Sequence, residues 1–540
     1  MPTLFEPLDQ ERPAAKWRRS SLLRLIGIFL LWWLLTAAVY RHTASNFLRA
    51  ESGWFLFLSH SSPAVQQGFE KVLLTKNFYS HYTPFAFLAE FETAKLAGTN
   101  GVFWTWRQIT VLALLATALF QFARASGAAL GMSRVQASSS AVALTAILVF
   151  QVQMREFVAW PFMIMQLLWL LFSVLALQSL LRMTQSPAET KWPWLAAAAA
   201  YLSLHVLGLG LATIAATAVT MTGLWLARRR AVSLPGLLIT KPLLSLLAIT
   251  ALHAIAMQQF MRATPLSSSP GWNASAFLPE SLGSIPNLVS AALRSLLSMT
   301  HSGPAPGQIS QDWPYGVAIL LGIALLVSAA FFRAVKDPTV RNQHRFLLHS
   351  FSSTLFLGII ALISLRLWLE PSPNGFAGYL SGSRHLIPVS FALAGILTEM
   401  FLLVAWLPVV PTVVLNVGVA ICALVAHLHF AAHIYPKAAP RARISHDRAW
   451  RSIVAMAREC QNAGLAIPNV PLGQLTQEFG DWDLKLFEPL LRADLKLPPE
   501  TKLELVPWND LANAAADNYS RQVPSLAAVK KRLRLDAPAR

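Results

Sequence analysis

The sequence predicts an all-α, polytopic membrane protein with about eleven transmembrane helices. Of its 540 residues, 55% are hydrophobic and only 13% are charged, whereas about a quarter of the residues in soluble domains are charged. The apolar residues form long runs, and a run that crosses lipid must satisfy its own backbone hydrogen bonds, which favours helices. The sequence lacks the period-2 alternation that a lipid-facing barrel needs.

The apolar runs differ in how clearly they are delimited. The first follows Lys16, Arg18 and Arg19 without a small-residue cleavage site, so it is expected to be a signal anchor. The stretch 192–227 is too long for one helix and short for two, and Gly208 and Gly210 mark the expected break. The spans are expected at residues 22–40, 104–123, 138–154, 158–181, 192–204, 207–227, 242–260, 317–332, 350–369, 386–407 and 411–433.

The net charge of +18 allows a nucleic-acid partner as one interpretation. Much of the charge lies between apolar runs, where it sets membrane topology, so no nucleic acid is expected. With the N-terminus in the cytoplasm, the short outer loops hold only Arg155 and Arg384. The inner loops then hold Arg124, Arg134, Arg182, Lys191, Arg228, Arg229, Arg230, Lys241, Arg333, Lys336, Arg341 and Arg345.

This orientation gives the domain organisation of a multi-pass protein of the inner (plasma) membrane. Residues 1–21 are a cytoplasmic segment, 22–433 the transmembrane domain and 434–540 an extracytoplasmic C-terminal module. The outer loops 41–103 and 261–316 share the side of the C-terminal module. A single span at 192–227 would instead move that module and the second loop inside, with the arginines at 228–230 outside.

The loops and the module carry further predicted helices. Residues 62–74 and 84–97 have helical apolar spacing, which suits helices in the headgroup plane or helices packed on the bundle. The loop 261–316 has an amphipathic stretch near 285–299 and is expected either to cover a substrate or to be irregular. In the module, Ser445 is the expected N-cap of a helix that runs to about Asn462, with Gly464 as C′ and an apolar face of Trp450, Ile453, Val454 and Ala457.

Signals for metal ions and cofactors are weak. Cys422 and Cys460 form no disulfide framework, and Cys422 is expected to pack within an apolar helix. Asp481-Trp482-Asp483 resembles an acidic nucleotide-sugar motif but has no preceding strand, so no metal site is assigned to it. There is no phosphate-cradling glycine loop, metal-type His/Cys spacing or nucleophile elbow. No cofactor is assigned, and a divalent cation near Glu51 and Glu156 is left open.

Two carboxylates at the expected outer membrane boundary are candidate site residues, since charge near lipid is costly. Glu51 follows the first span beside small and aromatic residues. It could deprotonate an acceptor hydroxyl, or it could be a solvated loop acid. Glu156, next to Arg155, could bind an acceptor or a metal ion, or it could form a local ion pair.

Basic and aromatic residues at the same boundary form the second group. His81 and Tyr82 precede Pro84, which suits a first helical turn, and they could line a sugar pocket or belong to an interfacial aromatic belt. Arg384, followed by His385, lies at the mouth of a late span, where a guanidinium suits bidentate phosphate binding. Arg366 could reach the same headgroup, and snorkelling is the alternative for both arginines.

Four motifs in this order resemble the GT-C superfamily of membrane glycosyltransferases, which includes the protein O-mannosyltransferases and the aminoarabinose transferases of lipid A. The resemblance covers roughly residues 20–435 and is architectural more than sequence-exact. The motifs are the first-loop acid Glu51, the segment His81-Tyr82-Thr83-Pro84-Phe85, the segment Glu156-Phe157-Val158-Ala159-Trp160 and the segment Arg384-His385-Leu386-Ile387-Pro388.

The resemblance implies a polyprenyl-phosphate sugar donor, a first-loop acid that acts as base, here Glu51, and a late arginine associated with the lipid phosphate, here Arg384. It also implies an acceptor-side role for Glu156. The family's first-loop acid is most often Asp or an acidic pair, whereas here a lone Glu51 precedes Ser52. That departure indicates an altered substrate or a degenerate site.

The expected function is therefore transfer of a sugar from a polyprenyl-phosphate donor, within membrane lipid, to an extracytoplasmic glycan, lipid or protein. The substrate-binding residues would be His81, Tyr82, Glu156, Arg366, Arg384 and His385. One alternative is a transporter or flippase for a lipid-linked glycan, although such proteins usually show inverted repeats and polar residues at mid-membrane. The other is a non-catalytic scaffold subunit of an envelope assembly.

Overall fold

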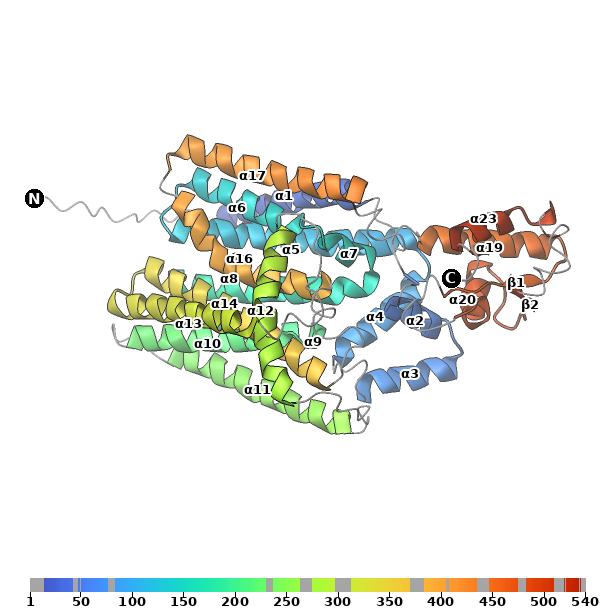
Figure 1. Ribbon diagram of the computed structural model, residues 1–540, viewed down its shortest axis with the longest axis horizontal. Coiled ribbons are helices and arrows are strands. Elements are labelled where there is room, and N and C mark those ends of the chain that lie inside the picture. The colour runs from blue at the N-terminus through green and yellow to red at the C-terminus, as the bar shows by residue number, and fades with distance from the viewer. Residues whose placement is uncertain are drawn as a thin grey trace, which may run out of the picture.

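The computed structural model consists of a long helix bundle, a layer of shorter helices at one end of it, and a small C-terminal module beyond that layer (Figure 1). It describes residues 14–41, 47–48, 50–75, 83–229, 237–262, 274–296, 312–369, 383–404, 407–434, 446–473, 482–508, 519, 521–533 and 535.

The bundle confirms a helical, multi-pass membrane protein. Eight helices in the described residues are long and apolar enough to cross a membrane, and two shorter apolar helices accompany them, so the count of about eleven stays a prediction. The bundle helices are α1 (Ala14–Tyr40), α5 (Gly101–Ala129), α6 (Arg134–Val149), α8 (Ile164–Gln185), α9 (Lys191–Val206), α10 (Gly210–Arg229), α11 (Leu237–Arg262), α13 (Trp313–Lys336), α14 (Val340–Leu369), α16 (Ser383–Val404) and α17 (Val409–His429), which a π turn at Phe430–Ile434 extends.

The expected break in the stretch 192–227 is present. α9 ends at Val206 and α10 begins at Gly210, so the stretch forms two helices. The chain turns so tightly here that a Cβ on Gly210 would lie 2.2 Å from the backbone nitrogen of Leu204. Glycine is needed because no side chain fits against the preceding helix.

Polar side chains join bundle helices that are distant in sequence. Asn416 of α17 donates to the hydroxyls of Ser139 and Ser140 of α6 at 3.1 and 3.0 Å. The indole of Trp33 in α1 donates to Thr110 of α5 at 3.2 Å. Within lipid, an apolar side chain packs about equally well against another helix or against a lipid tail. Hydrogen bonds between helices therefore help to fix which helices are neighbours.

The segment between α6 and α8 differs from the prediction. Spans at 138–154 and 158–181 implied a connection of a few residues, but α6 ends at Val149 and α8 begins at Ile164. Between them lie a short helix, α7 (Met154–Ala159), and a 3-10 turn, η1 (Pro161–Met163). Hydropathy extended the first span through Phe150, Val152 and Met154 and began the second at Val158 because these residues are apolar, yet all four are buried against protein.

Three helices form the layer at this end of the bundle: α2 (Ala50–Ser59), α3 (Pro63–Thr75) and α4 (Pro84–Ala97). A further helix, α12 (Ala274–Leu296), lies across the bundle helices (Figure 1). The helices predicted at 62–74 and 84–97 correspond to α3 and α4, and both pack against protein neighbours. Figure 1 shows α12 crossing the bundle helices at a steep angle. It packs against α13 and α16.

The C-terminal module is a small mixed unit. It contains α19 (His446–Asn462), β1 (Ile467–Asn469), η5 (Leu484–Phe487), α20 (Glu488–Asp494), β2 (Leu505–Pro507) and α23 (Ser525–Leu533). The two strands pair in parallel, with Ile467 opposite Leu505. The predicted apolar face of α19 is confirmed, since Trp450, Ile453 and Ala457 are fully buried.

The end of α19 also follows the prediction. Gly464 has a φ of +66°. Its N–H donates to the carbonyl of Gln461, and the next N–H, of Leu465, donates to the carbonyl of Cys460. This pair of bonds is a Schellman motif with Gly464 at C′.

Cys422 was expected to pack, but it is exposed on α17 because it lies on the face turned away from the other bundle helices. Of the acidic tripeptide, Asp481 lies outside the described residues, and Asp483 accepts from the side chain of Asn469 at 2.8 Å and from the N–H of Leu486 at 3.3 Å. Asp483 therefore acts as the N-cap of η5.

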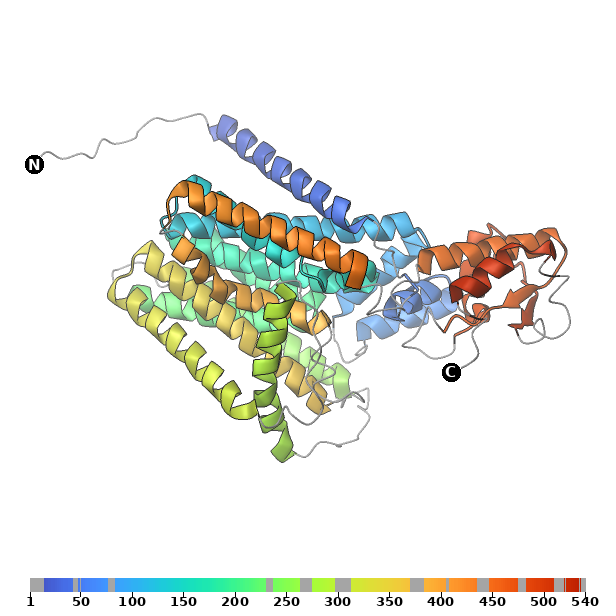
Figure 2. The same cartoon turned by 45° about the horizontal axis from the view of Figure 1, so that its top comes forward.

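The module and the layer share one apolar cluster, which includes Phe55, Phe91, Trp450 and Phe487. The rings of Phe57 in α2 and Phe487 in η5 meet with centroids 5.9 Å apart. Both views show the start of α1 at the opposite end of the bundle from the module (Figures 1 and 2). Which end faces the cytoplasm stays a prediction from the positive charges.

Candidate functional site at one end of the bundle

Glu51 lies in the first turn of α2, and its neighbour fixes that turn in place. The hydroxyl of Ser52 is buried and accepts from the backbone N–H of Phe162 in η1 at 3.1 Å. The side chain of Glu51 is half-buried. This carboxylate therefore belongs to a docked helix, and the interpretation as a fully solvated loop acid is wrong.

Glu156 lies in the first turn of α7, and a buried amide holds that helix. Gln108 of α5 is fully buried and donates to the carbonyl oxygens of Phe157 at 2.8 Å and Trp160 at 3.1 Å. The N–H of Trp160 donates in turn to the carbonyl of Glu156 at 3.0 Å. Because α2 docks on η1 and η1 continues from α7, the segments that carry both carboxylates form one connected structure.

A buried ion pair between α4 and α5 also contacts the segment that follows α7. Arg107 of α5 donates to both carboxylate oxygens of Glu90 in α4, at 2.8 and 3.1 Å. It also donates to the carbonyl of Pro161 at 2.9 Å, and its guanidinium lies 4.5 Å from the ring centroid of Trp104. Sequence reasoning missed this pair, although an arginine inside the predicted span 104–123 is the kind of residue that signals a buried partner.

The helix that carries the late motif also reaches this end of the bundle. α16 packs against α7, α12 and α14, and His385 in its first turn is buried. Arg384 lies in the first turn of α16 and Arg366 in the last turn of α14. The side chains of both arginines lie outside the described part of the chain, as do His81 and Tyr82 between α3 and α4.

His60 follows α2 and lies between the layer and the module. Burial lowers the pKa of its imidazole, although the carbonyl of Leu56 and the charge of Asp494 act in the opposite direction. Its Nδ1 is 3.1 Å from the carbonyl oxygen of Leu56 and 3.0 Å from the hydroxyl of Ser59. His60 is thus bonded to the last turn of α2.

Chain segments that are distant in the sequence meet at this end of the bundle. Two carboxylate-bearing segments meet the end of the bundle where the backbone of Arg384 begins α16. Within the residues that the structure describes, no three His, Cys, Asp or Glu side chains gather as a metal-binding group.

The fold and the site define a multi-pass membrane protein with a polar site at one end of its bundle and a docked module beside it. No protein-family model matches the chain, and no curated protein is significantly similar to it. Among solved structures, a crystal structure of ArnT from Cupriavidus metallidurans bound to undecaprenyl phosphate is similar to it. The match covers 96% of this chain and 89% of that chain, at 14% sequence identity and a TM-score of 0.31. A similarity this low assigns neither fold nor activity.

Proposed function

We propose that this protein is a membrane glycosyltransferase that moves a sugar from a polyprenyl-phosphate donor to an acceptor on the extracytoplasmic face. The observation that carries the proposal is the convergence of the segments with Glu51, Glu156 and Arg384 at one end of the bundle. The motifs that contain these residues are far apart in the sequence, at α2, α7 and α16.

Glu51 is the proposed general base. It would take the proton of an acceptor hydroxyl as the oxygen attacks the anomeric carbon of the donor, while the bond from sugar to phosphate breaks and polyprenyl phosphate leaves. The bond between Ser52 and Phe162 supports this role because it holds the backbone next to Glu51 on α2. A base fixed in this way needs little reorganisation when the acceptor arrives.

The binding roles follow from charge and position. Arg384 and Arg366 begin and end neighbouring helices, and a guanidinium can donate two parallel hydrogen bonds to a phosphate. Glu156 would orient the acceptor from α7. His81, Tyr82 and His385 would border the pocket.

A flippase or transporter for a lipid-linked glycan is the second candidate, and one observation favours it. α14 carries His344, His349 and Ser352 buried inside the bundle. Buried polar residues within a membrane often belong to a substrate path. The glycosyltransferase is preferred because the candidate carboxylates lie at one end of the bundle, whereas transporter sites lie near the midplane.

The test is sugar transfer by the full chain reconstituted in vesicles, with a panel of radiolabelled polyprenyl-phosphate sugars and a membrane-derived acceptor pool. Glu51→Gln should lower transfer by about a hundredfold, as expected for loss of a general base. The matched control is Glu92→Gln in α4, because Lys95 would keep its ion pair with Glu70 at 2.5 Å. Transport of labelled donor across the vesicle without transfer would support the flippase instead, and equal transfer by wild type and Glu51→Gln would refute the assignment of the base.

A further inference from the structure

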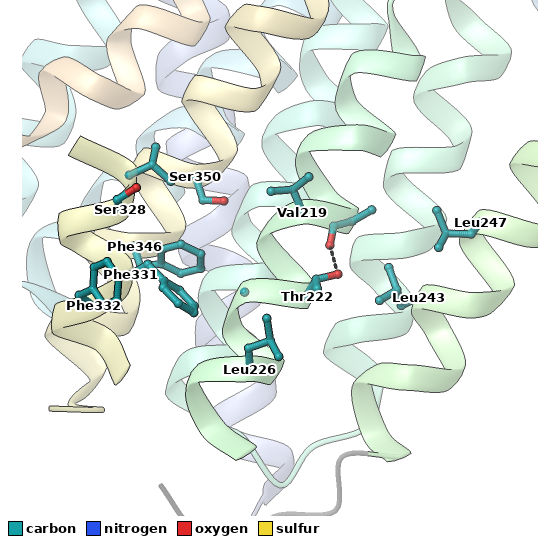
Figure 3. A pocket seen from close by; sticks show the side chains of 13 residues that line it. Val219, Thr222, Leu226, Leu243, Leu247, Ser328, Phe331, Phe332, Phe346 and Ser350 are labelled. Carbon is teal, nitrogen blue, oxygen red and sulfur yellow. Dashed lines mark hydrogen bonds between the residues drawn. The ribbon is translucent and has the colours of Figure 1, made fainter. Parts of the chain in front are cut away.

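A groove of about 480 Å³ lies between α10 and α11 on one side and α13 and α14 on the other. Figure 3 shows Val219, Leu226 and Phe332 among the apolar side chains that line it. It lies toward the ends of α10 and α13 and the start of α14, which is the end of the bundle away from the candidate site. The groove is therefore separate from the site described above.

The lining suits hydrocarbon because it is mostly apolar and two of its three hydroxyls, those of Thr222 and Ser350, are hydrogen-bonded within the protein. The hydroxyl of Thr222 donates to the carbonyl of Ala218 in its own helix at 2.8 Å (Figure 3). The hydroxyl of Ser350 accepts from Thr220 at 3.2 Å. A ligand in the groove would meet mainly Val, Leu and Phe side chains.

The groove depends on a glycine in α10. A Cβ on Gly223 would lie 2.2 Å from the ring of Phe346, so this position must lack a side chain for the ring to pack against α10. The ring of Phe346 lies 5.4 Å from that of Phe331, centroid to centroid. The aromatic wall is thus built by close packing between α10, α13 and α14.

Basic residues stand next to the lining at the same end of the helices. Arg229 follows Leu226 by one turn in α10, Lys241 precedes Leu243 in α11, and Arg333 follows Phe332 in α13. These three side chains are exposed. Arg228 is engaged elsewhere, since it donates to Gln343 and to the carbonyl of Met183.

We propose that this groove binds an anionic phospholipid, with an acyl chain along the apolar wall and the headgroup phosphate at Arg229, Lys241 and Arg333. An apolar groove between membrane helices with cations at its mouth matches the two parts of such a lipid. The positive-inside rule accounts for charge in the loops, but it does not require a cavity beside that charge. The donor proposed above would bind at the other end of the bundle, so this site is independent of it.

The experiment is a lipid titration of the purified, delipidated full chain in mild detergent, followed by native mass spectrometry. The probes are phosphatidylglycerol and phosphatidylethanolamine with identical acyl chains. The wild type should bind phosphatidylglycerol about tenfold more tightly, because each basic residue near an anionic headgroup adds to the attraction. Equal binding of the two lipids would overturn the proposal.

Two variants distinguish binding in the groove from a diffuse attraction to the positive charge at this end of the bundle. Thr222→Trp fills the groove from an exposed position, and Lys241→Gln with Arg333→Gln removes charge at its mouth without touching the core. Both should lose the preference for phosphatidylglycerol. The matched control is Arg124→Gln with Arg134→Gln, an exposed pair at the connection between α5 and α6, which should keep the preference.

The remaining outcomes are also decisive. Loss of the preference in the control as well would mean that the charge acts diffusely, and retention in Thr222→Trp would mean that the lipid binds elsewhere; either result overturns the proposal. If Thr222→Trp does not elute as a folded protein, the comparison between the two charge variants decides alone.

Discussion

The hydroxyl of Thr99 donates to both carboxylate oxygens of Asp494, at 2.8 and 2.6 Å, although 395 residues separate the two. The same carboxylate accepts from the indole of Trp450 at 2.6 Å. Close by, a Cβ on Gly101 would lie 2.5 Å from the carboxylate of Asp447, so the start of α5 and the start of α19 approach closely. The C-terminal module is thus fixed to the connection between α4 and α5, beside the candidate site.

Replacing Asp494 should loosen this attachment. Asp494→Asn removes the charge that accepts from both Thr99 and Trp450, and hydrogen bonds to a charged group are each worth about 1.5–3 kcal/mol. We expect faster release of the module in limited proteolysis and a lower unfolding temperature. Glu500→Gln, an exposed acid in the same module, is the control. Proteolysis at the wild-type rate in Asp494→Asn would show that apolar contacts alone hold the module.

The ion pair between Arg107 and Glu90 should be sensitive to the loss of one partner. Their side chains are only 14% and 5% exposed, so Glu90→Gln leaves a buried guanidinium without its counter-charge. Breaking such a pair costs about 3–5 kcal/mol, whereas an apolar replacement of both partners often costs less. Thermal unfolding in detergent should therefore rank Glu90→Gln below the double variant Glu90→Leu, Arg107→Met. The reverse order would mean that the pair is not desolvated.

His60 should make stability depend on pH. Because burial lowers its pKa below the usual value of 6.5, the unfolded chain binds a proton more readily than the native protein does. Stability is then fully present above the unfolded pKa and declines as pH falls from about 6.5 toward the native pKa. His60→Gln should flatten the unfolding temperature between about pH 5 and 7. An unchanged slope in His60→Gln would refute the assignment.

Much of the helical architecture could be predicted because it depends on local pattern. The break before Gly210, the helices α3 and α4 and the Schellman end of α19 at Gly464 all follow from spacing or from single residues with special backbone freedom. The segment 150–163 could not be predicted in this way. Its apolar residues have the hydropathy of a membrane span, whereas contacts with Ser52, Arg107 and Gln108, which are distant in sequence, hold it as a short helix and a 3-10 turn.

The residues of the candidate site were proposed from the sequence, but the contacts that hold their chain segments together could not be predicted. Ser52, Gln108 and Arg107 hold the segments together through partners 17 to 110 residues away. Long-range pairing of this kind leaves no periodic signal in one sequence. The docking of the module on Thr99 was invisible for the same reason, since neither Thr99 nor Asp494 lies in a recognisable motif.

The role of Glu51 is tested most directly by the pH dependence of single-turnover sugar transfer in wild type and Glu51→Gln, with saturating donor. If Glu51 is the general base, the wild-type rate should rise with pH as a carboxyl group deprotonates and then level off. Glu51→Gln should show a rate about a hundredfold lower with no such rise. A Glu51→Gln enzyme with the wild-type rate and the wild-type pH profile would contradict the account.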